Sequence, residues 1–307
     1  MTKKLAIVGP TGVGKSLLAC QVAIKLGGEI INTDSRQVYR GMDIGTAKPT
    51  KDQMGSVNHH LYDVVDPSDT FDIHLFKRMA ISMKTKIEEQ KKLPIFVGGT
   101  GQYVWSVIED WEIQENQADT GLREELELKL QSEGLGSLVA DLQRRYPEAV
   151  SAIDILNPRR VVRALEKAIL GYPIVNPRPK IPSSTNGWTI VGLTLGRSRL
   201  YKSVDRRIAC MVEAGWLSEV RYLVSRGLSP ELSSMGTIGY QEIYDFLGKR
   251  RDWSETIASI RARTHRLIRT QYNWFKLSDP RIDWYDVGDT DMSQISEQIS
   301  SKILDIV

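Results

Sequence analysis

Short apolar runs alternate with helical patterns over the first third of the chain. Residues 5–8 and 93–97 are short apolar runs, which is typical of strands buried in a parallel sheet, and residues 29–33 are interpreted as a second strand. Residues 17–24, between the first two runs, have the pattern of a helix. This alternation predicts an α/β fold with a parallel sheet over residues 1–108.

The alternation stops near residue 109. Residues 122–130 and 138–145 have the patterns of two acidic helices, and they replace the earlier succession of strand and helix. We therefore expect an inserted helical module over residues 109–156.

The remainder of the chain is expected to rejoin the α/β body that residues 1–108 begin. Four prolines between 173 and 182 mark an extended connector, and the apolar run at 188–195 predicts a strand that rejoins the sheet. From residue 198 onward most patterns are helical. We therefore predict one body made of residues 1–108 and 157–307, with a helical C-terminal region.

Composition narrows the class of protein without deciding it. A chain of 307 residues with 41% hydrophobic and 26% charged residues fits a globular protein of one large or two modest domains. No apolar run approaches the roughly 18 residues of a membrane span, and no cleavable signal precedes the first strand. Cys20 and Cys210 are too few for a disulfide framework or a cysteine zinc site. A cytoplasmic location is expected.

The net charge of +3 hides a strong pattern along the chain. Residues 109–143 hold ten acidic residues against two basic ones, whereas residues 144–180 hold eight basic against three acidic. Residues 197–276 are basic again, with fifteen against eight. Two basic blocks suit a polyanion that lies across part of the molecule, and solvated helix faces are the plainer alternative.

The strongest chemical signal lies between the first strand and the first helix. It is the phosphate-loop motif G-x-x-x-x-G-K-[ST], formed by Gly9, Pro10, Thr11, Gly12, Val13, Gly14, Lys15 and Ser16. Its backbone N–H groups can surround phosphate oxygens, Lys15 can reach the outer phosphate, and the Ser16 hydroxyl can ligate Mg²⁺. The motif is typical of nucleotide-binding proteins, which makes ATP a candidate ligand. A glycine-rich turn is the simpler alternative, but the order of strand, loop and helix favours a phosphate site.

An acidic residue follows the second strand. Asp34 is expected at the carboxyl edge of the sheet, where ligands of open α/β folds bind, although a helix cap is an equally simple role. A motor or signalling NTPase would place a Mg²⁺-binding acid after a later strand. The later strand here is followed instead by Gly98-Gly99-Thr100-Gly101. The loop therefore favours a diphosphate that is held for a reaction other than ATP hydrolysis.

Residues 34–49, which read DSRQVYRGMDIGTAKP, resemble the tRNA dimethylallyltransferase family. The resemblance covers almost the whole chain, and its further motifs are His59-His60-Leu61, Gly98-Gly99-Thr100-Gly101-Gln102-Tyr103, Arg163-Ala164-Leu165-Glu166, Gly239-Tyr240-Gln241-Glu242 and Thr270-Gln271-Tyr272-Asn273-Trp274-Phe275. It implies a P-loop NTPase-like parallel core and an inserted module that grips the anticodon stem-loop of tRNA. It also implies transfer of a dimethylallyl group from dimethylallyl diphosphate to N6 of the adenosine 3′-adjacent to the anticodon.

Roles follow from residue types and from the resemblance together. The phosphate loop would hold the donor diphosphate with Mg²⁺ on Ser16, and Asp34 would accept the proton of the adenine amino group. The resemblance places Arg207 on the diphosphate, so that the catalytic set is Lys15, Ser16, Asp34, Thr100 and Arg207. The residues expected at the tRNA are Asp34, Ser35, Arg36, Gln37, Thr100, Arg123, Arg159, Arg160, Val161, Val162 and Arg163.

The helix that should carry several of these arginines has a clear start. Asn157 can cap it and Pro158 can be its first residue. Arg159 and Arg163 are four residues apart and share a face, so they could contact phosphates or bases. We expect a monomer that binds tRNA and does not bind membranes.

Four places depart from the family pattern. Asp154-Ile155-Leu156-Asn157 stands where the family usually has His-Pro-Asn-Asp, and Ser203, His265 and Thr270 stand where it usually has arginine. We therefore expect tRNA affinity to be weaker or differently distributed. Three other functions stay open at this point: a free-nucleotide dimethylallyltransferase of the cytokinin type, a P-loop small-molecule kinase, and a non-catalytic RNA-binding protein.

Overall fold

The computed structural model describes every residue except 1–2, 114–119, 173, 175–184, 186 and 306–307. The chain divides into two compact units. Unit 1 consists of Met1–Asp110 and Pro182–Val307, and unit 2 is Trp111–Ile181. Unit 2 is therefore an insertion within the sequence of unit 1.

Unit 1 is built on a six-stranded sheet whose described pairings are all parallel. Its strand order is β3-β2-β4-β1-β5-β6, and its strands are β1 (Lys4–Val8), β2 (Gly28–Asn32), β3 (His59–His60), β4 (Leu93–Gly98), β5 (Trp188–Thr194) and β6 (Ile282–Asp286). The side chains of Leu5, Ile7 and Val8 are fully buried, as expected for a central parallel strand. The predicted α/β class is confirmed.

The strand register brings the carboxyl ends of β1, β4 and β5 to the same edge of the sheet. Val8 is paired with Gly98 of β4 on one side and with Gly192 of β5 on the other. The loops that follow β1 and β4 therefore leave the sheet at the same carboxyl edge, next to the end of β2. This is the edge at which open α/β sheets bind ligands.

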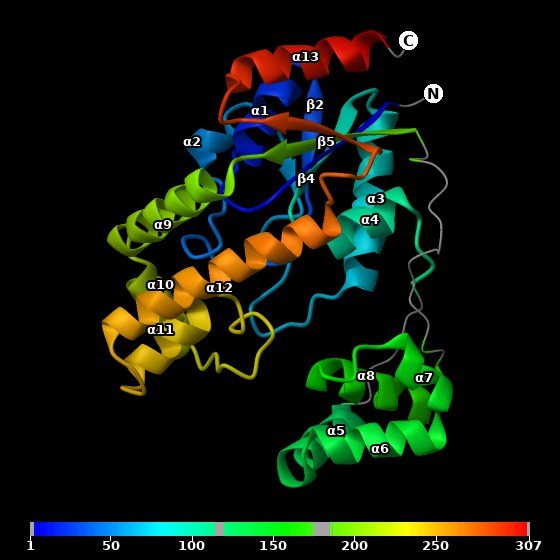
Figure 1. The fold of residues 1–307 in the computed structure, drawn as a ribbon. Helices are drawn as coiled ribbons and strands as arrows, with labels where there is room; N and C mark the ends of the chain where they lie inside the picture. Colours follow the sequence, from blue (N-terminus) through cyan, green and yellow to red (C-terminus); the bar gives the residue numbers. More distant parts are fainter. Residues whose placement is uncertain (1–2, 114–119, 173, 175–184, 186, 306–307) are drawn as a thin grey trace. The chain divides into compact units, whose positions relative to one another are not determined.

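The helices of unit 1 fall into two groups. Around the sheet lie α1 (Lys15–Leu26), α2 (Lys51–Met54), α3 (Ile73–Glu89), α4 (Gly101–Ile108) and α13 (Met292–Asp305), with α1 packed against α13 and α3 against α4. The second group is α9 (Arg197–Glu213), α10 (Trp216–Ser225), α11 (Tyr240–Leu247) and α12 (Trp253–Trp274), which pack on one another in sequence (Figure 1). The long α12 starts at Trp253, because Oδ1 of Asp252 caps it by accepting a hydrogen bond from the backbone N–H of Glu255.

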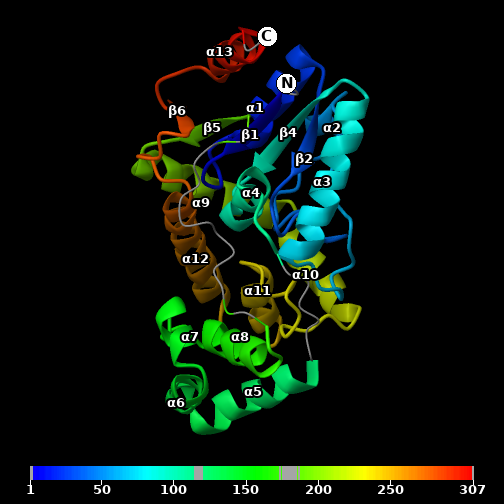
Figure 2. The same ribbon diagram turned by 90° about the vertical axis from the view of Figure 1, so that its right-hand side faces the viewer.

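Unit 2 is a small helical bundle (Figure 2), and it has its own core. It contains α5 (Thr120–Glu133), α6 (Leu135–Arg145), α7 (Pro147–Ala152) and α8 (Pro158–Ile169). Its core is made by Leu126, Leu138, Leu142, Val161 and Leu165, which are at most 7% exposed. The predicted end of the module at residue 156 differs from this structure, in which the unit continues to Ile181. The reason is the apolar face of α8, whose Val161, Val162, Ala164 and Leu165 belong to this core.

Among the described residues no helix is both long and apolar enough to cross a membrane.

Candidate active site

The phosphate loop connects β1 to α1 in a conformation that only glycine accepts easily. Gly9 has a φ of 140° and Gly12 a φ of 84°. A Cβ atom on Gly9 would lie 2.4 Å from the carbonyl oxygen of Leu193, and one on Gly12 would lie 2.6 Å from Cγ2 of Val204. The loop is therefore closely surrounded by β5 and α9, with backbone geometry suited to a phosphate.

Two cationic side chains lie against this loop. Lys15 donates a hydrogen bond from Nζ to the carbonyl oxygen of Pro10 (2.8 Å). Arg207, on α9, donates from Nη2 to Oγ1 of Thr11 (2.6 Å). The Nε atom of Arg207 is buried and has no hydrogen-bond partner within the described part of the chain. Because a buried donor without a partner is costly, the arrangement suits a bound anion.

The electrostatics of the two cations point to the same ligand. Desolvation lowers the pKa of Lys15 to about 8, with the Asp34 carboxylate acting in the opposite direction and the Arg207 guanidinium adding to the lowering. Desolvation also lowers the pKa of Arg207, against the effect of Asp34. Removing positive groups from water is unfavourable unless an opposite charge is bound, so a compact anion would relieve this cost.

Asp34 lies two residues beyond the end of β2. Its Oδ1 accepts the backbone N–H of Arg36 (2.8 Å), and its own N–H donates to Oδ1 of Asn32 (2.9 Å). Across the described residues, the Asp34 carboxylate has no other hydrogen bond. The turn explains how the carboxylate is oriented, and it leaves Oδ2 for a substrate proton. The helix-cap alternative does not describe this position, because the chain makes a turn here and not a helix.

Thr100 is brought next to Asp34 by the sheet. Its Oγ1 accepts the N–H of Ser35 (3.1 Å) and lies 3.4 Å from the Ser35 hydroxyl oxygen. Because β2 and β4 are neighbours, residues that are 65 positions apart in the chain meet at the carboxyl edge. The structure thus gathers Lys15, Arg207, Asp34 and Thr100 around the ends of three strands and the start of α1.

Arg36 and Gln37 are engaged with other backbone segments. Arg36 donates from Nη1 to the carbonyl oxygen of Ser233 (2.8 Å). Gln37 donates from Nε2 to the carbonyl oxygens of Thr46 and Ala47, both at 3.0 Å. In this structure both side chains therefore hold the loops around the site, and a direct tRNA contact by either stays a prediction.

The expected tRNA-binding residues of unit 2 differ greatly in exposure. Arg123 and Arg163 both bind the carboxylate of Glu166, at 2.8 Å and 2.7 Å, and Glu166 is only 1% exposed. Arg159 and Arg160 are exposed on the same helix. Arg160 also forms an exposed ion pair with Asp154 (3.7 Å), so Arg159 is the one of these four arginines for which no ion pair is found among the described residues.

The two valines of α8 were expected at the tRNA as well. The side chain of Val161 is fully buried in the core of unit 2, so a tRNA contact at this residue would involve its backbone and stays a prediction. Val162 is 5% exposed and lines a hollow of about 530 Å³. The other residues that line this hollow are Arg123, Glu127, Leu130, Gln131, Arg159 and Arg163.

Two further side chains that organise the site are absent from the predicted site residues, although Gln271 lies in one of the motifs that carry the resemblance. Glu219 of α10 accepts the backbone N–H groups of Asp43, Ile44 and Gly45 at 2.8–3.1 Å, which fixes the segment after Gln37. Gln271 of α12 contacts the phosphate loop. Besides that motif, the spacing of Gln271 is a signal, because it continues the buried face of α12 formed by Ile260, Thr264 and Ile268.

The positions that depart from the family pattern also have defined surroundings. Ser203 donates to the carbonyl oxygen of Gly12 (3.4 Å), so an uncharged hydroxyl stands beside the phosphate loop. His265 stacks on the Tyr201 ring, with centroids 3.9 Å apart, and its Nε2 lies 2.9 Å from Oδ1 of Asp205. Thr270 is exposed. At Ser203 the site therefore lacks one positive charge that the resemblance implies.

The two adjacent histidines do not form a metal site. His59 Nε2 lies 3.7 Å from Sγ of Cys20, whereas His60 Nε2 lies 2.6 Å from Oε2 of Glu29. Although desolvation opposes it, hydrogen bonds from Lys92, His60 and Asn58 lower the pKa of Glu29 to about 2. Adjacent residues of a strand point to opposite faces, as expected. The described residues contain no group of three or more His, Cys, Asp or Glu side chains that could hold a metal ion.

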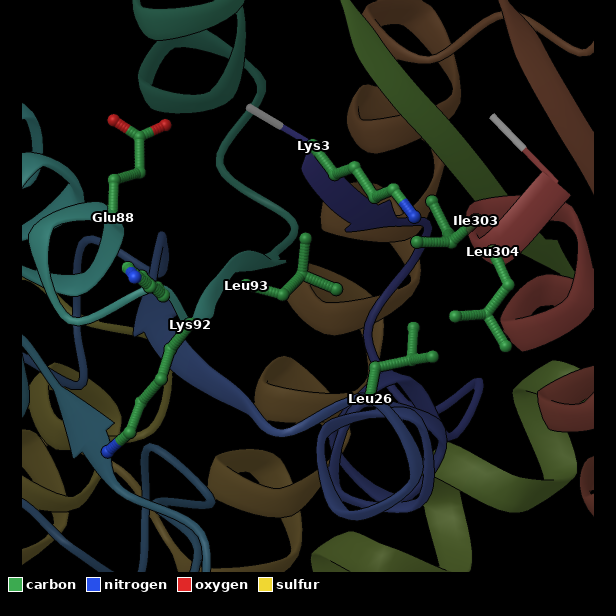
Figure 3. A pocket seen from close by; sticks show the side chains of 8 residues that line it. Lys3, Leu26, Glu88, Lys92, Leu93, Ile303 and Leu304 are labelled. Carbon is green, nitrogen blue, oxygen red and sulfur yellow. The ribbon is translucent and has the colours of Figure 1, made fainter. Parts of the chain in front are cut away.

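A second hollow, of about 350 Å³, lies at the amino edge of the sheet (Figure 3). It is lined by Lys3, Leu26, Glu88, Lys91, Lys92, Leu93, Ile303 and Leu304. Lys92 is paired with Glu29 (2.6 Å) and Glu88 with Lys84 (2.7 Å), so part of its charge is already neutralised. It lies at the edge opposite the phosphate loop, which is not the edge that binds ligands in this class of fold.

The fold and the site together define a phosphate-loop α/β protein with two cationic side chains against the loop and a neighbouring carboxylate. Comparison with known proteins identifies the family. The family model described as IPP transferase matches residues 37–278, and the model described as isopentenyl transferase matches residues 2–64. The chain belongs to the IPP transferase family.

Individual relatives agree along nearly the whole chain. A tRNA dimethylallyltransferase from Halalkalibacterium halodurans is 40% identical over 95% of this chain and 93% of its own length. One from Dehalococcoides mccartyi is 38% identical over 99% and 91%. The crystal structure of a tRNA isopentenylpyrophosphate transferase from Bacillus halodurans has a TM-score of 0.74 at 38% identity, covering 99% of this chain and 98% of that one. A eukaryotic dimethylallyltransferase described as acting on tRNA has a TM-score of 0.75 at 26% identity, covering 98% and 77%.

Proposed function

We propose that this protein transfers a dimethylallyl group from dimethylallyl diphosphate to N6 of the adenosine 3′-adjacent to the anticodon in tRNA. The observation that carries the proposal is the presence of two desolvated cations, Lys15 and Arg207, in the electrostatic neighbourhood of the Asp34 carboxylate at one edge of the sheet. The cations suit a diphosphate, and the carboxylate suits a proton acceptor. The family relationship supplies the identity of the donor and the acceptor.

The donor would lie with its diphosphate on the phosphate loop. In the reaction the bond between C1 of the dimethylallyl group and the diphosphate oxygen breaks, and the electron pair leaves with the diphosphate. Lys15 and Arg207, which lie against the loop, would stabilise the negative charge that grows on the diphosphate, together with N–H groups of the loop. Fixed donors of this kind stabilise a transition state more than they stabilise the ground state.

The acceptor would approach from the side of Asp34 and Thr100. The N6 nitrogen forms the new bond to C1 and loses one proton, which Oδ2 of Asp34 can accept because Oδ1 already binds the N–H of Arg36. An adenine amino group is a weak nucleophile, so orientation and proton removal matter. Thr100 and Ser35 provide hydroxyl groups beside that position, and the base must leave its stack to reach them.

Mg²⁺ fits this site as a companion of the diphosphate. Ser16 is exposed at the first turn of α1, and its hydroxyl would hold the ion together with diphosphate oxygens. Mg²⁺ usually binds phosphate substrates through one or two protein ligands and water, so the single hydroxyl is a sufficient protein contribution. When bound, the ion would supply charge neutralisation on the leaving group.

Unit 2 would bind the anticodon stem-loop through its basic residues, and the exposed Arg159 and Arg160 are suited to phosphate contacts. We also propose that the protein acts in the cytoplasm as a monomer. A site assembled within unit 1 from a single chain supports the second point, and a tRNA substrate supports the first.

The test is incubation with labelled dimethylallyl diphosphate and, separately, tRNA, AMP or ATP. We expect label only in tRNA, at the adenosine beside the anticodon, together with release of diphosphate. Label in AMP or ATP would indicate a free-nucleotide prenyl transferase. Phosphate transfer from ATP to a small molecule, without label in any acceptor, would indicate a kinase.

A further inference from the structure

Gln271 joins the two glycine-containing loops of the site. It lies on α12 and is 5% exposed. Its Oε1 accepts the backbone N–H of Thr11 in the phosphate loop (2.8 Å), and its Nε2 donates to the carbonyl oxygen of Gly99 after β4 (3.2 Å). A side-chain amide has one accepting and one donating end, so each loop uses the end that it requires.

Helix α12 approaches the second loop so closely that Gly99 and Gly101 have no room for a side chain. A Cβ atom on Gly99 would lie 2.2 Å from Nε2 of Gln271, and one on Gly101 would lie 2.3 Å from Cβ of Trp274. Trp274 is itself held, because its carbonyl oxygen accepts the Nε1–H of Trp105 (3.0 Å). The last turn of α12 therefore packs directly on the loop that carries Thr100.

The two residues that Gln271 binds, Thr11 and Gly99, each contact or adjoin a residue with a role in the proposed reaction. Thr11, whose N–H it accepts, receives the guanidinium of Arg207 on its hydroxyl (2.6 Å). Gly99, whose carbonyl it binds, immediately precedes Thr100, which contacts Ser35. One amide thus connects the side of the site that would hold the donor to the side that would hold the acceptor.

We propose that Gln271 is a positioning residue that sets the separation between the diphosphate and the acceptor base. This rests on the proposed transfer reaction. Gln271 touches no reacting atom, and it acts through Thr11 and Gly99. Reactions of this type depend steeply on alignment, since a displacement of about 1 Å can lower a rate by about a hundredfold. Losing the connection should therefore lower turnover more than it lowers the affinity for either substrate alone.

The experiment compares Gln271→Met with Tyr272→Phe in the full chain. Methionine keeps the length and volume of glutamine but makes neither hydrogen bond. The neighbouring Tyr272 bonds Oγ1 of Thr194 (2.8 Å) through its hydroxyl, so Tyr272→Phe removes one hydrogen bond from the same helical turn without affecting either glycine loop. We would measure kcat, KM for dimethylallyl diphosphate, tRNA affinity and melting temperature for both variants and for the unsubstituted enzyme.

We expect Gln271→Met to lower kcat by about 10- to 100-fold, with tRNA affinity within twofold and a smaller change in the donor KM. Tyr272→Phe should retain kcat, even if its melting temperature falls by as much as that of Gln271→Met. A kcat for Gln271→Met within threefold of the unsubstituted enzyme, or a fall that Tyr272→Phe shares, would overturn the proposal and leave Gln271 as a structural amide. If the unsubstituted enzyme transferred no label to tRNA, the proposed function itself would be refuted.

A second variant guards against misfolding of the first. Gly99→Ala leaves Gln271 in place but forces its Nε2 away from the Gly99 carbonyl oxygen. We expect the same selective loss of kcat. Wild-type kcat in a Gly99→Ala enzyme that folds would contradict the proposed alignment role.

Discussion

Two groups of basic side chains in this molecule differ in what neutralises them. In unit 1, Lys15 and Arg207 bind the uncharged oxygens of Pro10 and Thr11 and form no ion pair with the described residues. In unit 2, Arg123 and Arg163 share the buried carboxylate of Glu166.

This difference separates two kinds of anion binding. The cations of unit 1 are desolvated and uncompensated, which suits a compact ligand with concentrated charge. Arg123, Arg163 and Glu166 of unit 2 together carry a net charge of +1. Their long-range attraction for RNA is therefore weaker than that of two unpaired arginines. Solvated arginines beside it contribute through phosphate contacts that salt can screen. Four predictions test this contrast, in order of decreasing effect.

Removing the carboxylate of Asp34 in unit 1 should have the largest effect on the transfer reaction. We expect Asp34→Asn to lower the single-turnover rate of transfer by roughly 10²- to 10⁴-fold, the usual contribution of a general base. Affinity for tRNA should be nearly unchanged, since asparagine keeps the oxygen that accepts the Arg36 N–H. Rapid-quench measurement with saturating enzyme decides the matter. A loss below tenfold would remove Asp34 from the role of base.

Removing a cation of unit 1 should act on the donor alone. We expect Lys15→Ala to weaken binding of dimethylallyl diphosphate by at least about 30-fold, which corresponds to about 2 kcal/mol for a lost buried charge contact. Affinity for tRNA should not change. Equilibrium titrations with each substrate separately would show this. If tRNA affinity collapsed while donor affinity held, the phosphate loop would belong to the other substrate.

The lowered pKa of Lys15 predicts the pH dependence of donor binding. Its pKa is about 8 in the free protein, so Lys15 is mostly charged at pH 7 and mostly neutral at pH 9. Because a diphosphate binds the charged form, affinity should be highest below pH 8 and should fall above it, by up to about tenfold per pH unit. Lys15→Arg is the matched control, because arginine stays charged over this range. An equally steep fall in that variant would assign the titration to another group.

The smallest effect is expected at the solvated arginines of unit 2. Arg159→Ala should reduce the slope of log K against log salt for tRNA by roughly 0.7 to 0.9, the value for one phosphate contact. Arg163→Ala should change this slope less, because Glu166 already compensates its charge, but it should lower the melting temperature by leaving that carboxylate with fewer partners. If Arg163→Ala reduced the slope more than Arg159→Ala did, Glu166 would not neutralise Arg163 toward RNA. The contrast between the compensated cations of unit 2 and the unpaired cations of unit 1 would then fail.

The parts of the site that lie close together in sequence could be predicted from the sequence. The phosphate loop is a contiguous motif between a strand and a helix, and Asp34 and Thr100 each follow a strand of one parallel sheet. The rule that carboxyl ends of parallel strands share an edge then brings them together. The α/β class followed from the same alternation of elements.

The rest depends on pairings between distant residues, which no local pattern shows. Arg123 and Glu166 are 43 positions apart, and Gln271 meets Thr11 across 260 positions. The end of unit 2 was misplaced because α8 was interpreted from its arginines, whereas its valines and leucine pack with α5 and α6. A helix with one charged and one apolar face fits either unit by pattern, and only the packing decides between them.

The position of unit 2 within the chain has a consequence for synthesis on the ribosome. Strand β1 pairs with β4 and also with β5, but all of Trp111–Ile181 is made after β4 and before β5. At about 5–20 residues per second, the central strand waits several seconds for its second neighbour. Unit 2 is contiguous and can complete its core during that interval. The nascent sheet meanwhile exposes one long edge of β1, so the delay between β4 and β5 is the interval in which this chain is most open to aggregation and to chaperones.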